Sequence, residues 1–184
     1  VIINTRVNTD DEIYSGSGDD IIAPGPGSNI VNAGPGNDTI SVTRARVGGL
    51  GTIDTVDGGA GIDLLNLDHS DGNENWDVIT GTDGKNTTLR STDSFAAISK
   101  ALATAESFEV GSGSELTRYR NVEQVNLTTS TSSASFNDLL IFQGGTSYHA
   151  GNNGGDSSSS RGDTFFADWS SATSNITWNN DPTK

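Results

Sequence analysis

Residues 15–41 read SGSGDDIIA, PGPGSNIVN and AGPGNDTIS, three consecutive stretches of nine residues that align without a gap. In each stretch the second and fourth places are Gly, the sixth is Asp or Asn, and the eighth is aliphatic. Residues 6–14 (RVNTDDEIY) keep the sixth and eighth places but lack the glycines, and residues 58–66 (GGAGIDLLN) match the full pattern. The N-terminal part of the chain is therefore a nine-residue repeat.

Each repeat predicts a tight turn followed by a short strand. Glycine permits the positive φ that a tight turn needs, and a backbone bent in this way can direct carbonyl oxygens at a cation. One aliphatic residue in nine buries little surface alone, so we expect the strands to stack into a common core. The alternative is that these are ordinary hairpin turns, because Gly, Asp and Asn dominate turns in general.

The composition excludes several classes of protein and indicates an unusual source of stability. The 184 residues include 24 acidic and 10 basic side chains, a net charge of -14, and only 32% hydrophobic residues. Such an acidic chain does not fit nucleic acid, and no apolar run is long enough for a membrane helix. Cysteine is absent, which excludes disulfides and thiolate metal sites. Carboxylates that repel one another could be neutralised by a hard divalent cation.

The repeat resembles the RTX, or haemolysin-type, calcium-binding nonapeptide G-G-x-G-x-D-x-U-x. This resemblance implies an all-β fold, a right-handed parallel β-roll or β-helix, in which two nonapeptides form one coil and every second turn faces the same way. It also implies Ca²⁺ between stacked turns, which pairs Asp20 with Asp38 and Asp11 with Asn29. The implied calcium ligands are the turn carbonyls and sixth-place side chains of Asp11, Gly16, Gly18, Asp20, Gly25, Gly27, Asn29, Gly34, Gly36, Asp38, Gly59, Gly61 and Asp63.

Departures from the pattern weaken particular turns. Two prolines restrict the turn that precedes Asn29, and Asn29 itself offers a neutral oxygen, so the pair Asp20 and Asp38 ranks above the pair Asp11 and Asn29. The next partner of Asn29 is expected near residues 43–47, where the motif is lost. Asp63 resumes the pattern, but it lies further from Asp38 than two nonapeptides, which predicts an inserted loop at 48–51.

The nonapeptides at 6–66 are followed by a predicted insertion at 67–120. A hairpin is expected over 76–91 with Asp83–Asn86 as its turn. A helix is expected to follow, with either Thr92 or Asp93 as N-cap and an apolar face made of Phe95, Ile98, Leu102 and Ala105. Residues 71–82 resemble the start of an EF-hand loop but lack its glycine and its last acidic residue, so a polar surface loop is favoured.

Residues 121–184 are interpreted as a diverged continuation of the coil, with strands at 121–127, 139–142 and 164–166. Residues 150–156 resemble a repeat turn, and deleting 157–163 would restore a nonapeptide, which makes Asp156 and Asp163 further candidate calcium ligands. The segment Arg161, Gly162 and Asp163 resembles the integrin-recognition tripeptide and is a candidate partner-binding site. The favoured alternative is that it belongs to a calcium turn.

No catalytic template fits the sequence. There is no HExxH, no nucleophile elbow in register and no phosphate-binding GxxxxGK[ST]. We therefore expect a single domain, part of a larger protein, that is not an enzyme but a calcium-binding structural module of a secreted or cell-surface protein. The alternatives are an adhesive or surface-layer module and an accessory domain of a polysaccharide-acting enzyme. The expected partners are calcium, neighbouring domains and a receptor or polysaccharide, with neither nucleic acid nor membrane insertion.

Overall fold

The structure is a computed structural model. It describes residues 1–6, 8–43, 52–68, 77–82, 85–89, 93–104, 107–112, 115–128, 139–143, 149–150 and 164–168. The strands are β1 (Ile2–Asn4), β2 (Glu12–Tyr14), β3 (Ile21–Ala23), β4 (Ile30–Asn32), β5 (Thr39–Thr43), β6 (Ile53–Asp57), β7 (Leu64–Asp68), β8 (Asp77–Thr82), β9 (Lys85–Leu89), β10 (Ser107–Ser112), β11 (Glu115–Arg120), β12 (Gln124–Thr128), β13 (Leu139–Gln143), β14 (His149–Ala150) and β15 (Thr164–Asp168). The helix is α1 (Phe95–Leu102).

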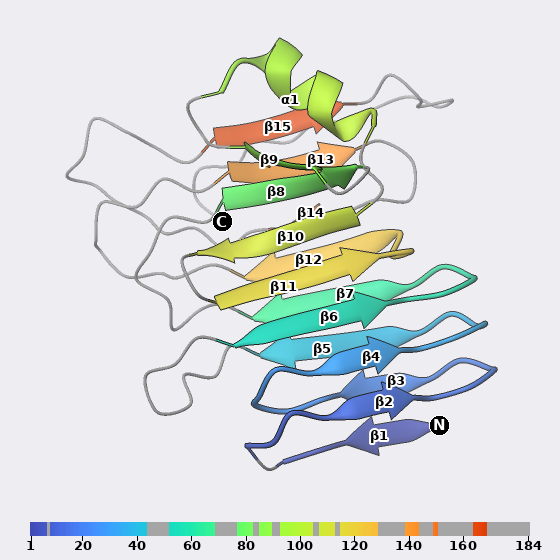
Figure 1. The fold of residues 1–184 in the computed structure, drawn as a ribbon. Helices are drawn as coiled ribbons and strands as arrows, with labels where there is room; N and C mark the ends of the chain where they lie inside the picture. The colour runs from blue at the N-terminus through green and yellow to red at the C-terminus, as the bar shows by residue number, and fades with distance from the viewer. Residues whose placement is uncertain are drawn as a thin grey trace, which may run out of the picture.

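From β1 to β7, successive strands alternate between two sheets. The first sheet has the order β1-β3-β5-β7-β12-β14, and the second has the order β2-β4-β6-β11-β10-β8-β9. The strand pairs from β1 to β7 are all parallel. Since each of these strands is followed in the chain by a strand of the other sheet, two strands complete one coil. Figure 1 shows this stack, with β1 at one end and α1 at the other. The predicted all-β class with parallel sheets is confirmed.

The register confirms the repeat length and shows that extra residues are inserted between β5 and β6. In the first sheet Ile21 pairs with Thr39, which is two nonapeptides further along the chain, and Thr39 pairs with Leu64 across a longer step. The longer step follows from extra residues between the end of β5 at Thr43 and the start of β6 at Ile53. The predicted loop at 48–51 falls in this interval, outside the described residues.

The core is a column of aliphatic side chains between the two sheets. The eighth-place residues of the repeat are buried in their short strands, and Val56 and Val125 continue the column in β6 and β12. Their neighbours point outward, as Ile21 and Ile30 do, each about half exposed. The buried eighth-place residues are Ile13, Ile22, Val31, Ile40 and Leu65. Stacking, rather than any single strand, therefore forms the core.

The predicted hairpin and helix are present with corrected boundaries. β8 and β9 pair antiparallel up to Thr82 and Lys85, so Lys85 and Asn86, predicted in the turn, lie in a strand; the rest of that turn lies outside the described residues. The N-cap of α1 is Ser94, neither Thr92 nor Asp93, because its side chain accepts a hydrogen bond from the backbone N–H of Ala97.

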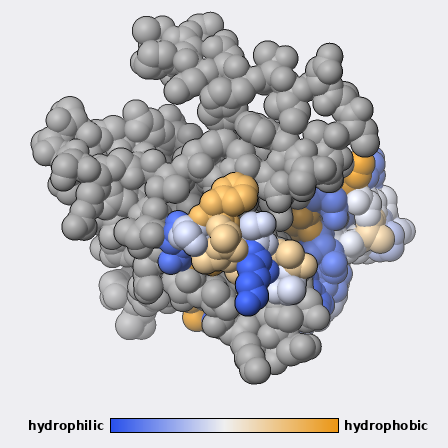
Figure 2. Space-filling view, turned by 90° about the horizontal axis from the view of Figure 1, so that it is seen from above, coloured by the Kyte–Doolittle hydropathy of each residue, from blue (hydrophilic) through white to orange (hydrophobic). Residues whose placement is uncertain are grey.

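The helix buries only part of its predicted apolar face. Ile98 is 1% exposed, but Phe95, the first residue of the helix, is 62% exposed. Ala101 packs against the core, and Ala105 lies outside the described residues. Seen from the end of the stack that carries α1, the described surface mixes hydrophobic and hydrophilic residues (Figure 2).

The stack resumes after the insertion. β11 pairs parallel with β6, and β12 pairs parallel with β7, although the inserted segment separates the two strands of each pair in the chain. The last strand of the range assigned to the insertion, 67–120, thus belongs to the stack. β13 and β15 match the strands predicted at 139–142 and 164–166, but they form a separate two-stranded parallel sheet. No helix in the described part of the chain is long and apolar enough to span a membrane.

Candidate metal centre

The glycine turns lie at both edges of the stack. Turns 15–20, 33–38 and 58–63 lead from the second sheet to the first and are called here the aspartate edge, because each ends in Asp. The turn 24–29 leads in the opposite direction and ends in Asn29; with the segments that pair with it, it forms the asparagine edge. Both edges consist of turns from successive coils, as the repeat predicts.

Turns on the aspartate edge are packed against one another through their backbones. Gly18 N–H donates to Pro35 O at 2.8 Å, and Gly36 N–H donates to Ala60 O at 2.8 Å. A Cβ atom placed on Gly34 would lie 2.0 Å from Gly16 O, and Gly34 has a φ of +94°. Only glycine fits there, because it needs no space for a side chain and adopts positive φ freely. Carbonyl oxygens of one turn therefore point towards the next turn.

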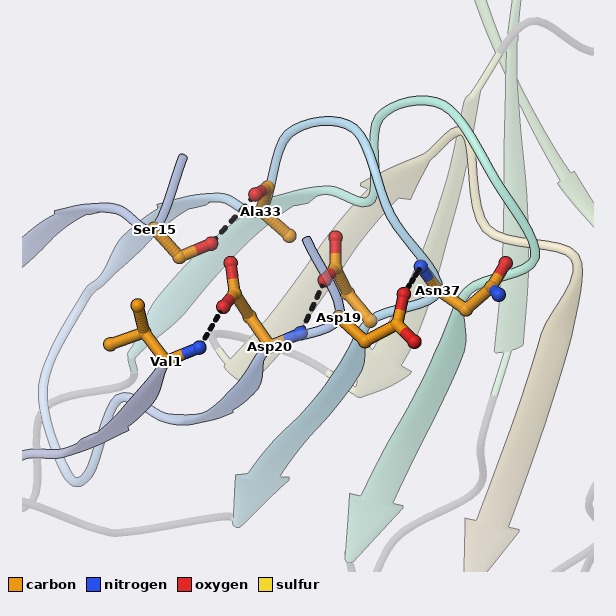
Figure 3. Close-up of polar contacts among 7 residues, drawn as sticks. Val1, Ser15, Asp19, Asp20, Ala33 and Asn37 are labelled. Carbon is orange, nitrogen blue, oxygen red and sulfur yellow. Dashed lines mark hydrogen bonds and ion pairs between the residues drawn. The ribbon is translucent and has the colours of Figure 1, made fainter. Parts of the chain in front are cut away.

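The sixth-place carboxylates join successive coils. Asp20 N–H donates to Asp38 Oδ1 at 2.8 Å, and Asp38 N–H donates to Asp63 Oδ1 at 2.8 Å. The same pattern continues at both ends: the amino group of Val1 donates to Asp20 Oδ1 (Figure 3), and Asp63 N–H donates to Glu123 Oε2 at 2.9 Å. The predicted pairing of Asp20 with Asp38 is present in the structure, and the ladder extends to Asp63 and Glu123.

The second oxygen of each of these aspartates has no hydrogen-bond partner. Asp20 and Asp38 are 1% exposed and Asp63 is fully buried, yet the Oδ2 atom of each accepts no hydrogen bond. Asp11 Oδ2 is buried and unpartnered in the same way. A buried charged oxygen without a partner is strongly unfavourable. The Oδ2 atoms of Asp20, Asp38 and Asp63 thus form a row along the aspartate edge, where the Val1 amino group on Asp20 Oδ1 is the one positive group that the described residues pair with these carboxylates.

The electrostatics of the row agree with this geometry. Loss of hydration raises the pKa of Asp38 and of Asp63, which favours the protonated form. Asp20 differs because the Val1 amino group, which donates a hydrogen bond to it, and next the nearby Ser15 hydroxyl lower its pKa. A bound cation would favour the ionised form of all three groups, as the amino group does for Asp20.

The asparagine edge has the same ladder with different groups. Asp11 N–H donates to Asn29 Oδ1 at 3.0 Å, which agrees with the predicted pair, and Asn29 N–H donates to Asp54 Oδ1 at 3.0 Å. The expected partner of Asn29 near 43–47 is therefore wrong: the partner is Asp54, because the longer connection after β5 adds residues to the coil between β4 and β6. Asp54 is 5% exposed, and loss of hydration raises its pKa to about 6.

Fifth-place side chains form a second ladder that runs the other way. Asp19 Oδ1 accepts the N–H of Asn37 at 2.8 Å in the next coil (Figure 3), and Asn37 Oδ1 accepts the N–H of Ile62 at 2.9 Å. Asp10 Oδ1 likewise accepts the N–H of Ser28 at 2.8 Å. These fifth-place groups are exposed and satisfied, so they are distinct from the buried sixth-place row.

Sequence reasoning missed Asp54 and Glu123 as sixth-place residues. No glycine precedes Glu123 at the places of the pattern, and the glycines before Asp54 (Gly48, Gly49 and Gly51) are out of register with it, so the signal that identified the others is missing. Each nevertheless stands two places before a buried core valine, Val56 or Val125, as every other sixth-place residue stands two places before its aliphatic. That spacing alone could have located them. The candidate residues Asp156, Arg161, Gly162 and Asp163 lie outside the described residues.

The groups on the aspartate edge suit a hard cation. Each gap between turns offers carboxylate oxygens from two coils together with backbone carbonyls, and Ca²⁺ takes six to eight such oxygen ligands. No group of three acidic, histidine or cysteine side chains gathers at one point among the described residues. Any cation there would thus depend on backbone oxygens for most of its ligands.

Comparison of the chain with protein-family models, with curated proteins and with solved structures found no match.

The raised carboxyl pKa values predict an unusual pH dependence for the metal-free protein. A carboxyl group whose pKa is higher in the folded state binds protons more tightly there, so stability rises as pH falls from 7 towards 4. For Asp54, with a folded pKa of about 6, the gain between pH 7 and pH 5 is about 1 kcal/mol. Circular dichroism of protein passed over a chelating resin should show a larger folded fraction at pH 5 than at pH 7.

Calcium should reverse this dependence of stability on pH, because protons then compete with the cation for the carboxylates. Urea unfolding in saturating CaCl2 is expected to show lower stability at pH 5 than at pH 7. The Asp54→Asn variant keeps the acceptor oxygen and should lose its share of the acid stabilisation in the metal-free protein. A metal-free protein that becomes less folded when the pH is lowered from 7 to 5 would contradict the raised pKa values of these carboxyl groups.

Proposed function

We propose that this chain is a calcium-binding structural module of the RTX type, folded as a right-handed parallel β-roll, in a secreted or cell-surface protein. Calcium would lie along the aspartate edge and hold successive coils together. The role is structural: the ion would neutralise the buried carboxylates and so allow an acidic chain with a small core to fold.

The observation that carries this proposal is the row of unpartnered Oδ2 atoms of Asp20, Asp38 and Asp63. Each belongs to a turn whose glycine carbonyls approach the neighbouring turn, as Gly16 O approaches Gly34 and Gly36 O approaches Gly61. Buried carboxylates occur when they are paired or when they coordinate a metal. The described residues supply no cationic side chain to this row, which leaves a cation as the group that suits it.

The proposal also explains the composition of the chain. With a net charge of -14 and 32% hydrophobic residues, the chain would be loose where calcium is scarce, and the resemblance to RTX proteins implies export in that state by a type I secretion system. Outside the cell, calcium would bind only the folded form and would stabilise it by mass action. A ligand at 1,000 times its dissociation constant contributes about 4 kcal/mol per site.

The direct test is a calcium titration of the metal-stripped protein followed by far-UV circular dichroism and calorimetry. We expect β-sheet signal and thermal stability to rise with CaCl2 and not with an equal concentration of MgCl2, since Mg²⁺ requires a near-ideal octahedral site and keeps several waters. Calorimetry should detect bound Ca²⁺ in the same concentration range. A stripped protein that is fully folded, binds no Ca²⁺ and melts at the same temperature with and without it would overturn the proposal.

A further inference from the structure

We propose that the side-chain amide of Asn29 takes the place of a cation, so that the part of the asparagine edge between Asn29 and Asp54 is ordered without calcium, whereas the aspartate edge depends on it. The inference rests on the proposed function, because it concerns which turns bind the ion. It is carried by the contacts of the Asn29 amide and by the unpartnered atoms at the equivalent places of the other edge.

Asn29 Nδ2 is surrounded by three oxygen atoms. It lies 3.1 Å from Gly25 O, 3.4 Å from Gly27 O and 2.9 Å from Asp54 Oδ1, and its two protons are shared among these three acceptors. Asn29 is fully buried, so no water competes for these contacts. The nitrogen thus sits among two turn carbonyls and the carboxylate of the next coil, which are the kinds of oxygen that bind calcium.

Asp38 occupies the equivalent place on the aspartate edge. Its turn has Gly34 and Gly36 at the positions of Gly25 and Gly27. Its backbone N–H donates to the sixth-place carboxylate of the next coil, as that of Asn29 does. Its Oδ1 accepts the N–H of the coil before, again as in Asn29. The one difference is the remaining atom, which is a donating nitrogen in Asn29 and an unpartnered oxygen in Asp38.

This difference decides what each turn requires. An amide nitrogen carries two protons and can hydrogen-bond to the oxygens around it, whereas an ionised carboxylate can only accept. The charge differs too, because Asn29 with Asp54 carries one negative charge and Asp38 with Asp63 carries two. Two buried carboxylates need a positive ion between them, and an amide next to one carboxylate does not.

The two edges should therefore become ordered at different stages of folding. The Asn29 amide can hold the coils of β4 and β6 in register before any ion is bound, and calcium then orders the opposite edge. The Asn29→Asp variant should make this part of the asparagine edge resemble the aspartate edge. It should add an ion site there and make the order of this edge depend on calcium.

The test compares Asn29→Asp with Asn37→Asp, which makes the same charge change at an exposed fifth-place amide that only accepts a backbone hydrogen bond. Isothermal titration with CaCl2 should give about one more ion per chain for Asn29→Asp than for the parent protein, and the parent stoichiometry for Asn37→Asp. In metal-free buffer the folded fraction of Asn29→Asp should be lower than that of Asn37→Asp, because the donor is lost and a buried charge is added.

The outcomes separate this inference from the proposed function. Equal stoichiometry in all three proteins overturns the inference and leaves calcium binding intact. Calcium binding by Asn29→Asp alone supports the inference and contradicts the proposed function, and no binding by any of the three overturns both. If Asn29→Asp does not fold, nuclear magnetic resonance of the parent decides: slow exchange of the assigned Asn29 amide protons in calcium-free, acid-stabilised protein supports the inference, and exchange at the rate of a free amide overturns it.

Discussion

Gly34→Ala is expected to destabilise the calcium-loaded protein by about 1–3 kcal/mol more than Gly16→Ala. The two glycines hold the same place in successive turns and have nearly the same φ, +94° and +98°. A side chain at either costs the strain of positive φ, about 1–2 kcal/mol. At Gly34 the new Cβ would also meet Gly16 O at 2.0 Å, whereas at Gly16 it would meet nothing within 4 Å. The difference between the variants therefore measures the close stacking of the turns.

The measurement is chemical unfolding of both variants in saturating CaCl2, followed by calcium titration. Because Gly16 O is a proposed ligand, Gly34→Ala should also weaken calcium binding, since the carbonyl that the new methyl group displaces would no longer point at the ion. Gly16→Ala should bind calcium nearly as the parent does. Equal losses of stability in the two variants would show that the turns are not stacked as described.

The nine-residue pattern was sufficient to predict the stacked core. The aliphatic side chain at each eighth place predicted the buried positions of β2 to β5 and of β7, and Ile22, Ile40 and Leu65 are completely buried. This succeeded because the position of each core side chain is set locally, by the turn that precedes its strand. The pairing of Asp20 with Asp38 followed from the same period and is present as a 2.8 Å hydrogen bond.

The pattern failed where a connection changed length or a turn was made without glycine. The partner of Asn29 was misplaced because the count from β4 to β6 includes the extra residues after β5, and the glycines before β6 (Gly48, Gly49 and Gly51) do not stand at the places that the pattern requires. The turn before Glu123 uses Asn121, with a φ of +51°, in place of glycine. Asparagine tolerates this conformation better than most residues, so the turn forms without the sequence signal.

Only the structure shows which sixth-place side chains have hydrogen-bond partners for both of their polar atoms and which leave one oxygen without a partner. The sequence showed that Asn29 is neutral, from which a weaker calcium site was inferred. It could not show that the amide nitrogen reaches the carbonyls of its own turn and the carboxylate of Asp54. Nor could it show that Asp38 and Asp63 each use one oxygen for a backbone hydrogen bond and leave the other without a partner.

This contrast gives the second large prediction, for the double variant Asp38→Asn and Asp63→Asn. Each amide keeps the Oδ1 atom that accepts the backbone hydrogen bond of the preceding coil. Each also replaces an unpartnered oxygen with a donor that can reach turn carbonyls, as Asn29 does. We expect the metal-free double variant to be more stable than the metal-free parent by about 1–3 kcal/mol for each carboxylate removed.

The same change should remove most of the response to calcium. Without these two carboxylates the aspartate edge keeps its carbonyls but loses the charges that attract the ion, so the stability gained on adding CaCl2 should fall by several kcal/mol. The matched control is Asp10→Asn with Asp19→Asn, which removes the same charge from exposed fifth-place groups that accept backbone hydrogen bonds. This control should keep the full calcium response and gain little stability in metal-free buffer.

The measurement is urea unfolding of the parent and both double variants, with and without CaCl2. It distinguishes a structural carboxylate from a metal ligand. If Asp38 and Asp63 hold a cation, their amides should make the protein stable without the ion and insensitive to it. If they serve only as hydrogen-bond acceptors, the amides should leave the effect of calcium as it is in the parent. A double variant that is destabilised equally in both conditions would contradict the cation assignment, because the repulsion that it should relieve would not exist.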